Sequence, residues 1–151
     1  LTFMTSNLYP IEIICNFEEV YHNKEIQEGN ILIKESLMRY EYIDKKLYTV
    51  IKQDENFYLV NNVQHENYQK ITDNIDLLNQ ISIIFEDLPN IENYYTNDDF
   101  DLKIEKSNKT NFIKRISVNS ENLNMSIYFY NCEKRKLDNK LFKHKPFFKN
   151  S

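Results

Sequence analysis

Short apolar and aromatic runs, separated by polar breaks of a few residues, fill the stretch from residue 27 to residue 71. Within these runs every second residue is apolar, as in the pairs Ile31 and Ile33 or Tyr48 and Val50. A period of two in runs rich in Ile, Val, Tyr and Phe is typical of half-buried antiparallel strands. The polar breaks have the length and composition of hairpin turns. The stretch therefore predicts a four-stranded meander with one apolar face.

Further strands are predicted on both sides of the meander. The candidates span residues 11–22, 100–106, 111–118, 123–132 and 140–148. We expect the last of them at a sheet edge, because Pro146 has no N–H to donate to a neighbouring strand. About nine short strands at regular spacing indicate an antiparallel sheet that curves toward a barrel.

One amphipathic helix is predicted over residues 72–88. Its apolar residues form a single stripe made of Leu77, Leu78, Ile81, Ile84, Phe85 and Leu88. Thr72 or Asp73 can cap its start, and Pro89 ends it. A short helical turn is expected at residues 91–95. By pattern alone, such a helix closes one end of a sheet.

The composition predicts a single globular domain over residues 1–151, with 41% hydrophobic and 28% charged residues. Residues 1–10 are uncharged, and we expect them to be the remnant of an export signal or a disordered N-terminus. The single glycine excludes Gly-rich phosphate loops and dinucleotide fingerprints, which need several. The net charge of −4 argues against a nucleic-acid partner.

Nothing in the sequence predicts catalysis. His22, His65 and His144 are scattered without metal-ligand spacing. Cys15 and Cys132 are too few for a zinc site; they are compatible with one disulfide that closes a long loop, as in an oxidising compartment, and equally with two buried thiols. We therefore expect no enzyme activity, no metal and no cofactor.

The meander resembles the outer-membrane lipoprotein carrier family, the periplasmic LolA-like proteins. The matching residues are Gly29, which opens a strand, and Ile31, Ile33, Arg39, Tyr40 and Tyr42. Three positions depart from the family pattern. The corner reads Lys34-Glu35-Ser36 in place of a basic residue followed by Pro, the turn at residues 54–56 has no Gly, and the next strand ends Val60-Asn61-Asn62 in place of Tyr-Asp.

The resemblance implies an incomplete antiparallel β-barrel in the periplasm, with one or two short helices as a lid over an apolar cavity. Such a protein carries the acyl chains of lipoproteins toward the outer membrane. An inner-membrane lipoprotein-releasing complex and an outer-membrane acceptor are the partners it implies, and we expect a monomer. Because the corner of the family pattern is altered, Lys34 or Arg39 would have to control the lid. By pattern alone, Arg39 pairs with Glu41 on the surface equally well.

The cavity prediction combines the strand pattern with this resemblance. We expect the concave face to be hollow, because unbranched Met and planar aromatic rings adapt to acyl chains. The residues expected to line it are Ile31, Ile33, Met38, Tyr40, Tyr42, Phe57, Leu78, Phe85, Phe112, Leu123, Met125, Ile127 and Phe129. Two alternatives stay open: a general periplasmic lipid- or glycolipid-binding module, and a structural or interaction sheet whose core is filled.

Overall fold

The computed structural model describes residues 11–109 and 112–144, so residues 1–10 and the predictions made for them lie outside the described part. The described chain forms one ten-stranded sheet, one α-helix and one short 3₁₀-helix. The elements are β1 (Glu12–Tyr21), β2 (Ile26–Lys34), β3 (Leu37–Tyr42), β4 (Tyr48–Gln53), β5 (Asn56–Asn61), β6 (Tyr68–Ile71), α1 (Asp76–Glu86), β7 (Tyr94–Thr96), β8 (Phe100–Lys106), β9 (Ile113–Ser120), β10 (Asn124–Lys134) and η1 (Asn139–Phe142).

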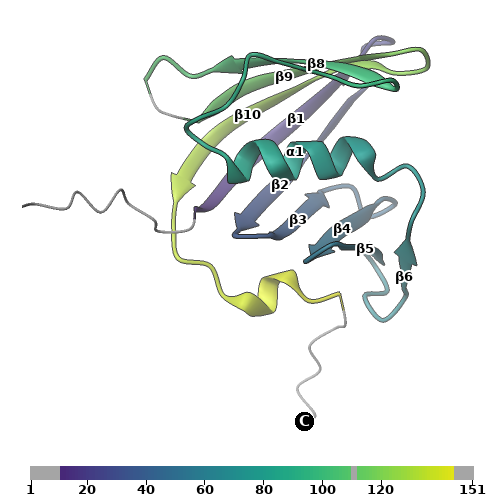
Figure 1. Cartoon of the computed structure of the whole chain (residues 1–151). Helices are drawn as coiled ribbons and strands as arrows, with labels where there is room; N and C mark the ends of the chain where they lie inside the picture. Colours follow the sequence, from purple (N-terminus) through teal and green to yellow (C-terminus); the bar gives the residue numbers. More distant parts are fainter. Residues whose placement is uncertain (1–10, 110–111, 145–151) are drawn as a thin grey trace, which may run out of the picture.

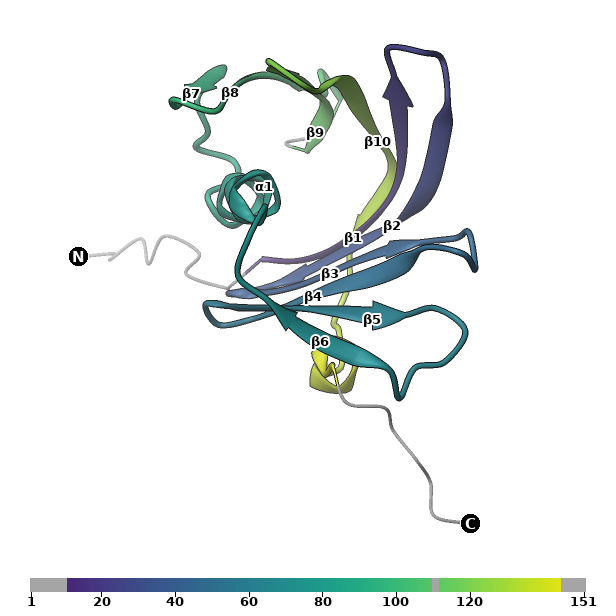
Figure 2. The ribbon, with the colours of Figure 1, turned by 90° about the vertical axis from the view of Figure 1, so that its right-hand side faces the viewer.

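The sheet is antiparallel throughout and its strands lie in the order β6-β5-β4-β3-β2-β1-β10-β9-β8-β7. β6 and β7 are its two edges, so the sheet is an incomplete barrel (Figure 1). Seen along α1, the sheet curves around the helix, with β7–β10 on one side and β1–β6 on the other (Figure 2). The predicted fold class, a curved antiparallel sheet with short helices, is confirmed.

The strand predictions are confirmed where apolar alternation is strong, and β8 has the predicted bounds. The predicted strands 111–118 and 123–132 are shifted or extended at their ends, to β9 and β10. Two strands were missed. β6 has mostly exposed side chains and therefore no apolar alternation, and β7 occupies part of the range predicted as a helical turn, residues 91–95.

The helix is confirmed over a shorter range than predicted. Neither Thr72 nor Asp73 caps it, since the N-cap is Ile75, whose side chain makes no capping hydrogen bond. Leu88 and Pro89 follow its end, as expected for a proline stop.

The prediction of an edge strand over residues 140–148 is wrong for its described part. η1 forms there instead, because the Asp138 side chain accepts a hydrogen bond of 2.9 Å from the Lys140 amide and Phe142 turns into a small cluster with Leu32 and Leu137. η1 lies on the convex side of the sheet, opposite α1 (Figure 2). We refer to residues 135–144 as the C-terminal strap. Residues 145–148 lie outside the described part.

The one glycine of the chain stands where the inner face of the sheet admits no side chain. A Cβ at Gly29 would meet the carbonyl oxygen of Glu41 at 2.1 Å and the Phe17 ring at 2.4 Å. Gly29 lies opposite Phe17 in the strand pair, and its lack of a side chain leaves room for the Phe17 ring. The Phe17 ring can therefore lie close to the sheet and stack on the Tyr40 ring, with 4.1 Å between ring centroids.

Cys15 and Cys132 are joined by a disulfide between the neighbouring strands β1 and β10. The register of this strand pair shifts between Ile14 and Asn16, and Asn131 has a positive φ of 52°. Such a shift is a β-bulge, which places an extra residue on one strand. The bond links two residues that are 117 positions apart in the sequence.

Candidate functional site

The concave face of the sheet gathers all of the side chains that were predicted to line a cavity. Ile31, Ile33, Met38, Tyr40, Phe57, Phe85, Ile127 and Phe129 are buried in one hydrophobic cluster, and Tyr42, Leu78, Phe112, Leu123 and Met125 are partly buried against it. They come from strands on both sides of β1 and from α1. The structure therefore brings these side chains into one cluster, and their role in binding a ligand stays a prediction.

The expected hollow, however, is occupied by the chain itself. On α1 the side chains of Ile81, Ile84 and Phe85 are fully buried, and the Phe85 ring contacts the Phe129 ring of β10 at 5.1 Å between centroids. The helix therefore lies inside the curve of the sheet and completes its core (Figure 2). A lid that merely covered a mouth would not bury its apolar stripe in this way.

A buried lysine on β4 ties α1 to the sheet. The Lys52 ammonium donates a hydrogen bond of 2.9 Å to the Ser82 hydroxyl and lies 3.7 Å from a carboxylate oxygen of Glu86. The side chain of Lys52 is 7% exposed, whereas that of Glu86 is 29% exposed. Among the described residues, these are the side-chain hydrogen bond and ion pair that connect α1 with the sheet.

A buried carboxylate lies further along the same face. Glu19 on β1 is 2% exposed and accepts hydrogen bonds from the hydroxyls of Tyr21, Tyr40 and Tyr42. The Tyr42 hydroxyl lies 3.0 and 2.8 Å from the two carboxylate oxygens. Every buried side-chain polar atom of the described residues has a partner, so this network is satisfied internally.

These surroundings perturb the tyrosines. Burial, together with the negative charge of Glu19, raises the pKa of Tyr21, Tyr40 and Tyr42 above the ordinary tyrosine value. The three hydroxyls therefore stay protonated at neutral pH and act as donors to the carboxylate.

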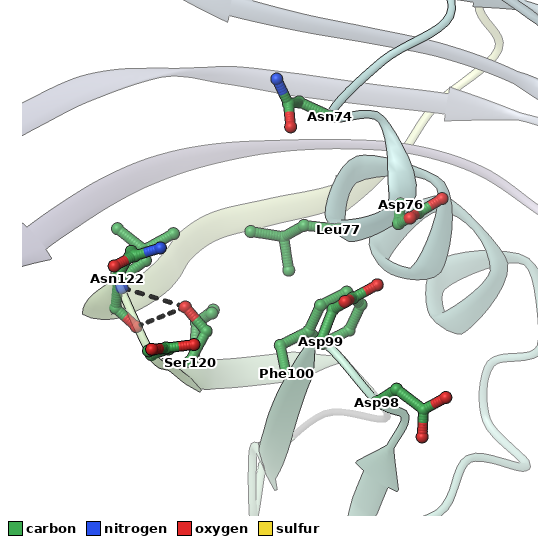
Figure 3. Close-up of a pocket in the computed structure, with 11 residues that line it drawn as sticks. Asn74, Asp76, Leu77, Asp98, Asp99, Phe100, Ser120 and Asn122 are labelled. Carbon is green, nitrogen blue, oxygen red and sulfur yellow. Dashed lines mark hydrogen bonds between the residues drawn. The ribbon is translucent and has the colours of Figure 1, made fainter.

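A pocket of about 540 Å³ opens at the N-terminal end of α1 (Figure 3). Its apolar lining comprises Leu77, Phe100, Val118 and Leu123, and its polar lining comprises Asn74, Asp76, Asp98, Asp99, Ser120, Glu121 and Asn122. Ser120 closes the turn beside it through hydrogen bonds with the Leu123 backbone. Of the residues predicted to line a cavity, only Leu123 lines this pocket. A smaller pocket of about 360 Å³, which includes Tyr48 and Leu59, lies beside β5 and β6.

Lys34 and Arg39, the residues assigned to lid control, bind the C-terminal strap. The Lys34 ammonium donates to the carbonyl of Leu137 at 2.8 Å, and the Arg39 guanidinium donates to the carbonyl of Leu141 at 3.1 Å. Arg39 also pairs with Glu41 at 2.7 Å, the surface pairing that the pattern left open. The described contacts of both residues lie on the convex face, while α1 lies on the other.

Sequence reasoning missed Glu19, Lys52 and Ser82 as functional candidates. A signal was available for the first two, because each stands at an inward position of its strand. Glu19 lies two positions after Phe17, and Lys52 lies two positions after Val50, so each shares a face with an apolar residue. A charged residue at such a position requires a buried partner. The identity of that partner comes from non-adjacent strands or from α1, which local patterns do not reveal.

The three histidines do not form a cluster in the structure. His22 and His65 lie in exposed turns, and His144 stacks on Tyr58 at 3.7 Å between ring centroids. Among the described residues no group of three or more His, Cys, Asp or Glu side chains could hold a metal ion.

None of the described helices has the length and apolar character needed to cross a membrane.

Comparison with known proteins identifies a fold but no family. No protein-family model matches the chain, and no curated protein sequence matches it. Among solved structures, the chain is similar to the crystal structure of a LolA superfamily protein from Nitrosomonas europaea, with a TM-score of 0.52 and 8% sequence identity. The match covers 89% of this chain and 90% of that chain. The likeness therefore extends over nearly the whole sheet and is one of fold.

Proposed function

We propose that the protein binds acyl chains of a lipid-modified molecule on the concave face of its sheet, and that α1 moves aside to admit them. In this proposal the chain is a non-catalytic carrier of lipoproteins. The single observation that carries it is the position of α1: a curved apolar sheet face is filled by one helix that lies between the two edges of an incomplete barrel.

The exchange of helix for acyl chain is energetically balanced. Removing Ile81, Ile84 and Phe85 from the interior costs about 5–9 kcal/mol, at about 1.5–3 kcal/mol for each fully buried side chain. Each buried methylene returns about 0.8 kcal/mol. About ten methylenes, fewer than one long acyl chain supplies, therefore offset the loss.

Two further observations support the proposal. The solved structure with the similar fold is that of a LolA superfamily protein. A disulfide between Cys15 and Cys132 is suited to an oxidising compartment such as the periplasm. We extend the proposal to the partners that a lipoprotein carrier requires, a releasing complex at the inner membrane and an acceptor at the outer membrane.

Binding is tested with a synthetic triacylated lipopeptide, which we expect to displace the neutral dye N-phenyl-1-naphthylamine from the protein. The same peptide without acyl chains is the ligand control. Met125→Gln, which places a polar group on the partly buried inner face, should weaken dye binding about two- to fivefold, as expected for the loss of roughly one apolar contact. Leu141→Gln on the exposed strap should leave it unchanged.

Hydrogen exchange tests the movement of α1. With lipopeptide bound, the amides of residues 76–86 should exchange faster, while those of β1 and β10 should not change. Binding without faster exchange in α1 would place the lipid elsewhere on the molecule. A folded protein that binds neither dye nor lipopeptide would leave the structural or interaction sheet as its function.

A further inference from the structure

Lys52 is the only buried cation among the described residues, and it lies on the face that the proposed ligand would occupy. Its cross-strand neighbours are Met38 and Phe57, both buried. Its two partners, Ser82 and Glu86, both belong to α1. The charge on Lys52 is therefore compensated by the helix and not by the sheet.

Displacement of α1 would remove both partners together. An ammonium left without a partner in an apolar interior is strongly disfavoured, because the protein supplies neither water nor a counter-charge. A ligand that brings a negative group to the same place restores the pairing, whereas a ligand with a neutral or positive group does not. This difference makes the site selective for the charge of the head group.

We infer that Lys52 binds the anionic head group of an acyl ligand and makes the protein selective for anionic amphiphiles. The inference rests on the proposed function, because it requires acyl chains to replace α1. The head group would lie where the Glu86 carboxylate now lies, at the margin of the interior, since the Glu86 side chain is 29% exposed. The chain would then extend over Met38 and Phe57 into the space vacated by Phe85.

The other polar group on this face does not offer a competing site. The Glu19 carboxylate is saturated by three tyrosine hydroxyls from β1 and β3, and these partners do not belong to α1. Its environment is therefore unchanged by displacement of the helix. Lys52 is the charged group whose pairing depends on whether α1 is in place.

The test uses three amphiphiles that share one alkyl length and differ in charge: dodecanoate, 1-dodecanol and dodecyltrimethylammonium. Each is titrated against the neutral dye N-phenyl-1-naphthylamine at neutral pH. We expect dodecanoate to bind at least about tenfold more tightly than dodecanol, as expected for a hydrogen bond to a charged group. Dodecyltrimethylammonium should bind most weakly.

Variants then assign the preference to one residue. Lys52→Met should abolish the advantage of dodecanoate and leave dodecanol within about twofold, since the apolar contacts remain. Lys103→Met, the same change at an exposed position on β8, should leave the preference intact. Because Lys52→Met also removes the partner of Ser82 and Glu86, Glu86→Gln gives an independent measurement: it removes the internal competitor and should increase the preference about two- to fivefold.

Each outcome decides one of the two proposals. Dye binding with equal affinity for the three amphiphiles overturns the inference about Lys52 and leaves the acyl-binding function standing. A preference for dodecanoate that survives Lys52→Met, or that is unchanged by Glu86→Gln, also overturns it. If the folded protein binds neither the dye nor any of the three amphiphiles, the proposed function fails and this inference fails with it.

Discussion

Glu19 shows how the inner face accommodates a charge without water. Three tyrosine hydroxyls surround its carboxylate, two from neighbouring positions on β3 and one from β1 itself. Phe17 and Tyr40 stack beside it, so the network is fixed by aromatic packing on one side. The hydrogen bonds to the Glu19 carboxylate and the packing of the aromatic rings thus stabilise the same end of the core.

Replacing the carboxylate should be costly. Glu19→Gln keeps the size of the side chain but removes the charge that all three hydroxyls share. We expect the free energy of unfolding to fall by about 1.5–3 kcal/mol, the usual value of hydrogen bonds to a charged group. Urea denaturation measures it, and Glu18→Gln, on the opposite face of β1, should change it by less than about 0.5 kcal/mol. Equal effects of the two substitutions would contradict the network.

Alkaline pH should destabilise the fold through the same tyrosines. Because burial raises the pKa of Tyr21, Tyr40 and Tyr42 in the folded chain, the unfolded chain loses those protons first. Stability is therefore fully present below about pH 10, the ordinary tyrosine pKa, and falls as the pH rises above it. Absorbance of the phenolate should show three of the eleven tyrosines ionising only as the chain unfolds. Ionisation of all eleven in the folded protein would contradict this.

At the scale of elements, strands were predictable where one face is buried and the other is exposed to solvent. β8 shows that alternation, and its bounds follow from sequence. β6 does not, because its side chains are mostly exposed and only its backbone pairing with β5 defines it. The position of α1 was also beyond the sequence: its stripe indicates burial but not whether the helix covers a cavity or fills it.

The C-terminal strap is the part of the described chain for which the sequence-based prediction was furthest from the structure. Residues 140–142 were predicted to begin an edge strand, yet Phe142 packs against Leu32 on the convex face, more than a hundred positions earlier in the chain. Gln53 of β4 donates to the Phe142 carbonyl at 2.8 Å and helps to hold it. A long-range contact of this kind overrides a weak local pattern.

Neighbouring residues of the strap should therefore respond differently to truncation. Phe142 is 1% exposed, whereas Leu141 is 38% exposed. We expect Phe142→Ala to lower the free energy of unfolding by about 3–5 kcal/mol. Leu141→Ala should lower it by no more than about 0.5 kcal/mol. Thermal or urea denaturation measures both, and a small effect for Phe142→Ala would show that the strap unfolds separately from the sheet.

At the scale of the whole molecule, an interior pair of the sheet brings together the first and the last strand of the described chain. β1 lies between β2 and β10, and the disulfide connects it to β10. The sequence predicted the meander and the individual strands, but this pairing could not be predicted from local patterns, because its partners are so far apart. The pattern also left the state of the two cysteines undecided.

The disulfide should contribute strongly to stability, since it closes a loop of more than a hundred residues. We expect the double substitution Cys15→Ala with Cys132→Ala to lower the free energy of unfolding by about 2–4 kcal/mol. Urea denaturation of both proteins gives the difference. Wild-type protein unfolded in the presence of reductant should approach the double variant, and identical midpoints for oxidised wild type and variant would contradict the prediction.

The place of β1 in the sheet has a consequence for how the protein is made. A ribosome releases β1 more than a hundred residues before β10, so one side of β1 has no hydrogen-bonding partner while those residues are synthesised. Exposed strand edges promote association between chains. Slow production or early truncation of this protein should therefore yield aggregates, with β1 as the strand that nucleates them.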